Sequence, residues 1–153
     1  MKFLLFMLAL LAPATMAAAQ DVSLSSEVFV EKTVKDAKGE AKVVREKPEI
    51  VTPGDRLVFV LSYKNQSTQP ATGFAVTNPV PDAVAFAAAE GTAAKVSVDG
   101  GKSWGQLAAL TIASPDGTRR PAATADVTHI RWNFAQPIAA GAGGQLSFRG
   151  IVK

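Results

Sequence analysis

The amino-acid sequence predicts an all-β fold, an immunoglobulin-like antiparallel β-sandwich with about nine short strands. Stretches in which apolar and polar residues alternate with a period of two recur along the chain. Turn-forming clusters of Gly, Pro, Asp and Asn separate them at intervals of roughly eight to twelve residues. No segment combines a helical period with end caps. Neither the buried tryptophan nor the paired cysteines of antibody domains are expected, so the prediction concerns the general architecture.

The bulk composition predicts one globular domain over residues 20–153. The chain has 153 residues, of which 48% are hydrophobic and 19% are charged. These proportions are typical of folded proteins, and a chain of this length buries enough surface for one core. The formal net charge is +3, and because acidic and basic residues alternate, we expect no nucleic-acid partner. The sequence contains no Cys, so the core must stabilise the fold without disulfides.

Residues 1–19 have the pattern of a secretory signal peptide. Lys2 supplies a positive start, Phe3 to Ala12 form an apolar core, and Ala17 to Ala19 provide small residues at the exit. The apolar run is shorter than the roughly 20 residues that span a bilayer. We therefore expect cleavage after Ala19 and no transmembrane span in the mature chain. The pattern predicts export to the periplasm or the cell surface of a bacterium.

Residues 20–50 predict a charged β-ribbon. Apolar and polar residues alternate from Val22 onward, and Asp36 to Gly39 form a turn that folds Val28 to Lys35 back against Ala41 to Lys47. The ribbon offers a strand edge to which a partner strand could pair. Its dense charges argue the other way, because charged edges resist such pairing.

Residues 51–153 predict the sandwich itself, which begins with a turn and a central strand. Pro53 and Gly54 suit the two middle positions of a type II turn, and Asp55 follows them. The run from Arg56 to Tyr63 is apolar on both faces in its first half, which favours a central strand. Asn65 opens the polar turn that ends it.

The following segment predicts a short strand, Gly73 to Thr77, that prolines bring to an end. Pro79 and Pro81, directly after Asn78, lack the amide hydrogens that a ladder needs. Beyond the prolines, the pattern predicts a short strand at Val84 to Phe86 and leaves Ala87 to Ala94 open between a loop and a helical turn.

The second half of the chain contains a strong hairpin pattern. Lys95 to Val98 and Ser103 to Leu107 flank a Gly-rich turn, and Leu107 to Ala113 is expected to extend the second arm. The remaining elements are expected in this order: a turn at Pro115 to Gly117, an irregular connection over Thr118 to Asp126, a strand with one aromatic face at Ile130 to Phe134, a loop over Pro137 to Gly144, and a last strand from Gln145 to Lys153.

Residues Thr52 to Ala87 resemble a bacterial conserved-repeat domain of unknown function that occurs in large surface and envelope proteins. The matching motifs are Pro53-Gly54-Asp55, Asn65-Gln66-Ser67 and Asn78-Pro79-Val80-Pro81. The chain's end, Ile138 to Gly141 followed by Gln145 to Val152, is similar to the last turn and strand of that family. The resemblance implies an immunoglobulin-like fold with a structural or adhesive role, and it supplies no catalytic residues.

The chain departs from the family pattern in three ways. Asn78 stands where the family usually has Asp, and Ser67 stands where it has Gly. These changes speak against a charge-dependent role for this region. The family is usually found in tandem copies, whereas this chain contains one copy and no internal repeat.

The segment Ser97 to Trp104 resembles the Asp-box of sialidases and related propeller proteins. Asp99 is expected to accept turn amides, Gly101 to take a positive backbone angle, and Trp104 to pack over the hairpin. This structural interpretation is preferred, because the box is a fold element even in sialidases. A sugar contact by the exposed edge of Trp104 is the alternative.

We expect no catalytic residue, no metal and no cofactor. His129 is the sole histidine of the sequence, so a zinc site would lack its usual partners. The aspartates fall in separate turns, where Asp is common for structural reasons. A calcium ion held between two such loops stays an open alternative. Asn65-Gln66-Ser67 fits an N-glycosylation acceptor but is interpreted as a turn, and Arg119-Arg120 as a solvated loop.

The sequence therefore favours an exported, non-enzymatic structural or interaction module of the bacterial envelope, with an envelope protein or a glycan as its partner. A small carbohydrate-binding module that uses Trp104 is the alternative. A third hypothesis, favoured less, is an all-β accessory enzyme built from turn carboxylates.

Overall fold

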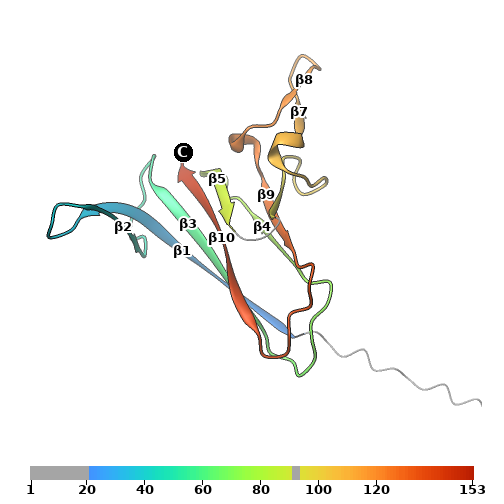
Figure 1. Cartoon of the computed structure of the whole chain (residues 1–153). Coiled ribbons are helices and arrows are strands. Elements are labelled where there is room, and N and C mark those ends of the chain that lie inside the picture. Colours follow the sequence, from blue (N-terminus) through green and yellow to red (C-terminus); the bar gives the residue numbers. More distant parts are fainter. Residues whose placement is uncertain (1–20, 91–93) are drawn as a thin grey trace, which may run out of the picture.

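The computed structural model describes residues 21–90 and 94–153, so the predicted signal peptide lies outside the described residues. The predicted all-β, antiparallel fold is confirmed (Figure 1). The described residues form ten strands and two short 3-10 turns. In chain order these are β1 (Val22–Lys35), β2 (Ala41–Glu46), β3 (Arg56–Asn65), β4 (Ala75–Pro79), β5 (Val84–Glu90), β6 (Ala94–Ser97), η1 (Leu107–Ala109), β7 (Thr111–Ala113), β8 (Arg119–Pro121), η2 (Thr124–Asp126), β9 (His129–Asn133) and β10 (Gly143–Val152).

The strands form three antiparallel sheets. The main sheet has the order β2-β1-β3-β10-β5, the second sheet has the order β4-β9-β6, and β7 pairs only with β8. The central position expected for Arg56 to Tyr63 is thus confirmed, since β3 lies in the middle of the main sheet. Its neighbours come from opposite ends of the described chain: Phe59 pairs with Val28 of β1 on one side and with Phe148 of β10 on the other.

The core lies between the main sheet and the second sheet. Alternation places Leu57, Phe59 and Leu61 of β3 on the inner face. Phe59 stacks on Phe148 of the adjacent strand, with ring centroids 4.4 Å apart and planes 1° from parallel. Burial of such side chains stabilises a fold by roughly 1.5 to 3 kcal/mol each. The other buried members of this core are Val30, Val76, Val80, Val84, Phe86, Val96, Val127, Ile130, Trp132 and Leu146.

The expectation that the core would lack a buried tryptophan was wrong. Trp132 of β9 is 1% exposed, and its ring lies 6.4 Å from that of Phe148 in the opposite sheet. Its indole N–H donates to the carbonyl of Glu90 at 3.0 Å. A buried tryptophan needs such a partner for its polar edge, and here the partner is the last residue of β5.

The segment between the hairpin and β9 differs from the prediction. The second arm of the hairpin is reduced to one bridge between Val96 and Gly105. Leu107 to Ala113 does not extend that arm, because η1 and then β7 occupy it. Within Thr118 to Asp126, expected to be irregular, the structure has β8 and η2. The alternation of this segment is masked by small residues, and its two three-residue strands are too short to show a period.

Several strand boundaries also shift. The short strand expected at Val84 to Phe86 continues as β5 to Glu90, which resolves the ambiguity over residues 87–90 in favour of a strand. The last strand starts two residues earlier than expected, at Gly143. Residues 91–93 lie outside the described residues.

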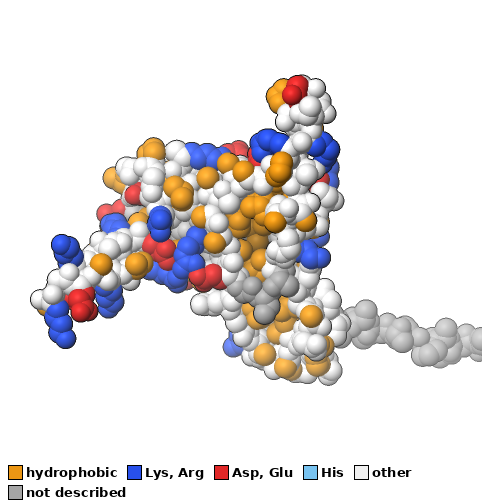
Figure 2. Space-filling view, turned by 45° about the horizontal axis from the view of Figure 1, so that its top comes forward, with side chains coloured by type: hydrophobic (Ala, Val, Ile, Leu, Met, Phe, Trp, Pro, Cys, Tyr) orange, Lys and Arg blue, Asp and Glu red, His pale blue; other side chains and the backbone are white. Residues whose placement is uncertain are grey.

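The predicted ribbon is present and leaves the sandwich at one end (Figure 1). The first part of β1, Val22 to Glu31, pairs with β3 and belongs to the main sheet. From Lys32 to Lys35, β1 pairs only with β2. The turn that joins the two strands is closed by the amide of Asp36, which donates to the carbonyl of Glu40 at 2.9 Å. Charged side chains cover this projecting part (Figure 2).

Among the described residues, no helix has the length and apolar character that a membrane crossing requires.

Candidate functional site

The hairpin at Ser97 to Trp104 is organised around one carboxylate. Asp99 Oδ1 accepts the amide hydrogens of Lys102 at 3.0 Å and Ser103 at 2.9 Å. The hydroxyls of Ser97 and Ser103 donate to its two oxygens at 2.7 Å and 2.6 Å. These hydrogen bonds, that from the Ser103 hydroxyl above all, hold the pKa of Asp99 well below its usual range. The carboxylate therefore stays charged, and its lone pairs serve the turn.

Trp104 is positioned by the same turn. Gly101 has φ +89°, a conformation in which side chains are strained, and its carbonyl accepts the indole N–H of Trp104 at 3.0 Å. The guanidinium of Arg131, on β9, lies 4.0 Å from the centre of the Trp104 ring. His129 meets that ring edge-on at 6.4 Å.

These contacts bear on Trp104 as a predicted ligand contact. Its only polar atom is used inside the hairpin, and a cation–π contact with Arg131 occupies one face of the ring. Stacking of a sugar on that face requires that Arg131 move away. The arrangement favours a structural role for the hairpin.

Asn65 joins the end of β3 to the loop before β10. Its side chain is fully buried, and its amide nitrogen donates to the carbonyls of Gln69 at 2.8 Å, Ile138 at 2.9 Å and Ala139 at 3.2 Å. Its Oδ1 accepts the hydroxyl of Ser67 at 2.8 Å. An N-glycan needs an accessible side-chain nitrogen, so this geometry favours the turn interpretation of Asn65-Gln66-Ser67.

The other predicted turn residues also use their polar groups locally. At the turn before β3, which holds Pro53, the amide of Asp55 donates to the carbonyl of Thr52 at 3.0 Å, and Gly54 has φ +95°. This is the predicted type II geometry. At the exit of β4, Asn78 donates to the carbonyl of Pro79 at 2.8 Å. The carbonyl of Pro81 accepts the amide of Val84 at 2.8 Å.

His129 and the acidic residues are the side chains from which a catalytic or metal-binding centre would be built. His129 Nδ1 lies 3.0 Å from the hydroxyl of the adjacent Thr128. Over residues 21–90 and 94–153, no group of three or more His, Asp or Glu side chains is arranged to hold a metal ion. The turn aspartates Asp55, Asp99 and Asp116 each bond to their own turn.

A chain of four charged side chains, which no local sequence pattern predicts, crosses the outer face of the main sheet. Arg45 of β2 pairs with Glu31 of β1 at 3.3 Å, and Glu31 also pairs with Arg149 of β10 at 3.2 Å. Arg149 then pairs with Glu90 of β5. Hydrogen bonds from Arg149 are the main cause of the lowered pKa of both glutamates. We call Arg45, Glu31, Arg149 and Glu90 the ion chain.

The ion chain covers an apolar residue of the central strand. Val58 points away from the second sheet, yet it is 0% exposed. Its partners in register are Phe29 on β1 and Arg149 on β10. Because Arg149 reaches from β10 to Glu31 on β1, the ion pair spans β3 beside Val58. Local patterns give no indication of it, because 118 positions separate Glu31 from Arg149.

At Arg119-Arg120, where a solvated loop was expected, the structure has the short strand β8 and an ion pair. Arg120 binds Asp126 with two parallel hydrogen bonds of 2.7 Å and 2.8 Å. This pair lowers the pKa of Asp126 to about 2. Arg119 donates to the hydroxyl of Thr111 at 2.8 Å, across the small β7-β8 sheet. Both arginines thus fix the segment that precedes β9.

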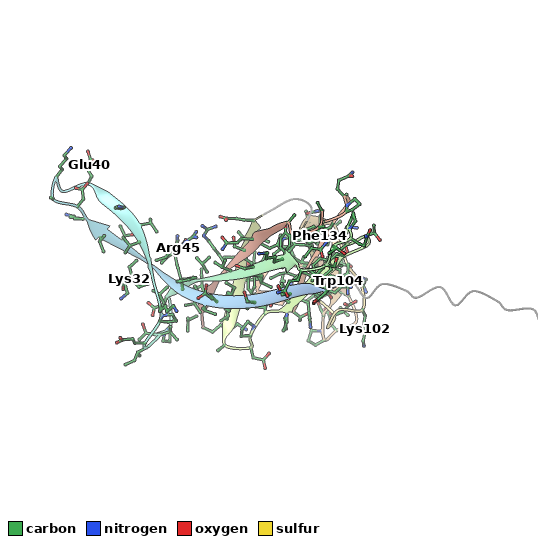
Figure 3. All side chains as sticks on the ribbon, turned by 90° about the horizontal axis from the view of Figure 1, so that it is seen from below. Lys32, Glu40, Arg45, Lys102, Trp104 and Phe134 are labelled. Atoms are coloured by element: carbon green, nitrogen blue, oxygen red, sulfur yellow. The ribbon has the colours of Figure 1, made fainter. Side chains whose placement is uncertain are left out.

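The ribbon differs from all these elements because its side chains are mostly free. Figure 3 shows Lys32, Arg45 and Glu40 along the ribbon, at the far end of the molecule from Trp104 and Phe134. Every residue from Lys32 to Val43 is exposed. Lys32 pairs with Glu46 at 2.9 Å on the surface. The strand β2 has one neighbour, β1, so its outer edge is unpaired in the described structure.

Two hollows lie at opposite ends of the main sheet. One, of about 480 Å³, lies at the base of the ribbon and is lined by Val30, Lys32, Glu46 and residues 47–50. Its rim includes Ile50, which is 83% exposed. The other, of about 380 Å³, is an aromatic cleft lined by Tyr63, Trp132, Asn133, Phe134, Ala135, Gln136 and Leu146.

Comparisons of the chain with protein-family models, with curated proteins and with solved structures gave no match.

Proposed function

We propose that this protein is an exported, non-enzymatic interaction module of the bacterial cell envelope, and that the ribbon, β1 from Lys32 together with β2, contacts its partner. Export is supported by the signal-peptide pattern of residues 1–19. The resemblance of Thr52 to Ala87 to a conserved-repeat domain of envelope proteins supports the compartment and the module type.

The observation that carries the contact role is the ordered ribbon with a free edge. Exposed strand edges promote unwanted pairing, so proteins usually shorten or cover them. Here β1 continues beyond its pairing with β3, and β2 extends it without adding to the core. Val34 and Val43 on the ribbon are 39% and 60% exposed. A segment of this kind adds little to the stability of the sandwich but is suited to pairing with a partner strand.

The non-enzymatic part of the proposal rests on how the polar groups are used. Acids with lowered pKa values, such as Asp99, Asp116 and Asp126, are bound by neighbouring hydroxyls, amides or arginines. A general acid or base near neutral pH requires a shift in the opposite direction for a carboxyl. These three acids therefore suit a structural role better than proton transfer.

Photo-crosslinking in the producing bacterium tests the proposal. A photoreactive residue in place of Val43 should give a discrete crosslinked product, since Val43 lies on the free edge. The same residue in place of Ile151, which is 39% exposed on β10, is the matched control. Fractionation and N-terminal sequencing should place the chain outside the cytoplasm with Gln20 first. Equal products from both positions, or a cytoplasmic chain, would overturn the proposal.

A glycan partner is the second candidate, and the aromatic cleft favours it more than Trp104 does. Tyr63 and Phe134 meet edge to face with centroids 4.8 Å apart, and the exposed amides of Asn133 and Gln136 line the same hollow. Aromatic rings beside a few polar groups are common in small-molecule sites. A glycan array with the native chain, Phe134→Ala and Trp104→Ala tests this candidate. Binding that Phe134→Ala abolishes and Trp104→Ala spares would support it, and an array without binding would exclude it.

A further inference from the structure

We propose that the free edge of β2 pairs with the same edge of a second copy of this chain, so that two five-stranded main sheets join into one continuous sheet. This proposal rests on the proposed function, because it names a second copy of this chain as the partner that the ribbon contacts. It follows from which backbone groups of β2 are free and from where its charges lie.

The free backbone groups belong to alternate residues of β2. At the ribbon turn the amide of Asp36 donates to the carbonyl of Glu40. Hydrogen-bonded and non-hydrogen-bonded pairs alternate along an antiparallel ladder, and the β1–β2 register has no shift. The backbone groups of Lys42, Val44 and Glu46 therefore face β1. Those of Val43 and Arg45 face outward, where a partner strand can bind them.

Two-fold symmetry then restricts the registers. Outward-facing residues must pair with outward-facing residues, so neighbouring registers differ by a relative shift of two residues. Each such shift moves the two-fold axis by one residue along β2. If Val44 lies opposite Val44 of the second copy, Val43 pairs with Arg45, and Lys42 lies opposite Glu46. Symmetry repeats the Lys42–Glu46 pair, so two ion pairs flank one apolar pair on the same face of the joined sheet.

The adjacent registers lack this complementarity. With Val43 on the two-fold axis, Glu40 lies opposite Glu46, and like charges directly opposite are destabilising. With Arg45 on the axis, Lys42 lies opposite Pro48 and no opposite charges meet. Lys42 also makes no ion pair in the described part of the chain, so it is free to bind a second copy. The charges that oppose indiscriminate pairing thus select one symmetric register.

Disulfide trapping tests the register directly. The native sequence has no Cys, so a single introduced Cys can form only an intermolecular disulfide. Val44→Cys lies on the axis in a non-hydrogen-bonded pair, where Cα atoms are about 4.5 Å apart. That separation suits a disulfide. We expect a covalent dimer of the exported chain under mild oxidation.

Val43→Cys is the matched control, because it is the neighbouring residue and more exposed than Val44. In the proposed register it lies two residues away from its symmetry mate, roughly 8 Å between Cα atoms, which exceeds the disulfide range. Val44→Cys should therefore dimerise at least about tenfold faster. Equal rates, a faster Val43→Cys, or no dimer of Val44→Cys would overturn the proposal.

Charge exchange provides a second measurement without Cys. Lys42→Glu converts two attractive contacts into repulsive ones and should raise the dimer dissociation constant roughly tenfold in sedimentation experiments. Adding Glu46→Lys restores opposite charges across the axis and should recover part of that loss, because the same change breaks the Lys32–Glu46 ion pair within each ribbon. A Lys42→Glu variant that dimerises as well as the native chain would contradict the proposal.

The outcomes also separate this proposal from the proposed function. A chain that stays monomeric in these assays, yet crosslinks from Val43 to a different protein in cells, would overturn the second copy and support the ribbon as a contact element. A monomeric chain without a crosslink from Val43 would overturn both.

Discussion

The hairpin at Ser97 to Trp104 and the β1-β2 ribbon are opposites in how they use their side chains. In the hairpin, one carboxylate collects hydroxyls and amides, and the indole bonds back to its own turn. In the ribbon, the residues from Lys32 to Val43 are exposed, and the Asp36 carboxylate accepts two turn amides but no hydroxyl. The hairpin has the more recognisable motif, but its groups are already engaged. The comparison teaches that a sharp motif can be a fold element, while a plain alternating segment keeps its groups free for binding.

The largest effect is expected from loss of the buried hydroxyl in the hairpin. Ser97 is 0% exposed, and its hydroxyl also accepts the amide of Gly101 at 2.9 Å. Ser97→Ala leaves the Gly101 amide without this acceptor and removes one of the hydrogen bonds to the Asp99 carboxylate, so we expect the free energy of unfolding to fall by about 2 kcal/mol. Thr33→Ala on the ribbon should change it by less than about 0.5 kcal/mol. Denaturant unfolding measures both, and similar losses would break the comparison.

The next largest effect is expected at the ion chain, where the ribbon joins the main sheet. Arg149→Ala leaves Glu31, whose side chain is 11% exposed, without its main partner and uncovers Val58. We expect a loss of about 1 to 2 kcal/mol in the free energy of unfolding. Arg45→Ala, at the other end of the ion chain, should cost about 0.5 kcal/mol or less, because this arginine is 45% exposed. A larger loss for Arg45→Ala than for Arg149→Ala would show that the ribbon contributes to the stability of the sandwich.

A smaller difference in stability is expected between alanine substitutions of two glycines with similar backbone conformations, one in the hairpin and one in the ribbon. Gly101 has φ +89° and Gly39, at the ribbon turn, has φ +82°. Alanine at either position is strained by about 1 kcal/mol. In Gly101→Ala this should lower the global free energy of unfolding. In Gly39→Ala it should only open the ribbon locally, which hydrogen exchange of amides in β2 would detect without a change in the global transition.

The smallest effect is expected in the pH dependence of stability at acidic pH. The folded-state pKa of Asp99 is lowered, so its carboxylate stabilises the fold above the usual aspartate pKa of about 3.9. This contribution is lost as the pH falls through the folded-state value. Asp99→Asn should therefore lower the Tm at neutral pH, and its difference from the native chain should shrink towards about pH 2. Glu40→Gln at the ribbon turn is the control and should leave the Tm unchanged. A constant Asp99→Asn difference would contradict the assignment.

Local pattern was sufficient to predict most strands and the turn chemistry. The period of two in β3 and the Pro53-Gly54 pair specify their structure within a few residues, and so does the Asp99 turn. The burial of Trp132 was missed because it depends on which strand of the other sheet lies opposite. The β7-β8 pair was missed because its strands are too short to show alternation.

The ion chain could not be predicted, because it depends on strand order. Alternation places Glu31 and Arg149 on outward faces, but only the order β1-β3-β10 brings them together. The free edge of β2 likewise becomes visible only when the sheet order is known. Trp104 is predicted as a ligand contact from a motif, whereas the ribbon is favoured by its position in the sheet.

The position of β3 between β1 and β10 has a consequence for the order in which the protein folds. One neighbour of β3 precedes it closely, while the other, Gly143–Val152, is the last of the described strands to leave the ribosome. The main sheet cannot close before that strand arrives, and pairings so distant in sequence make folding slow. An emerging chain thus stays incompletely folded until β10 has been synthesised. For the exported chain that we propose, this delay would keep the polypeptide unfolded until it has crossed the membrane.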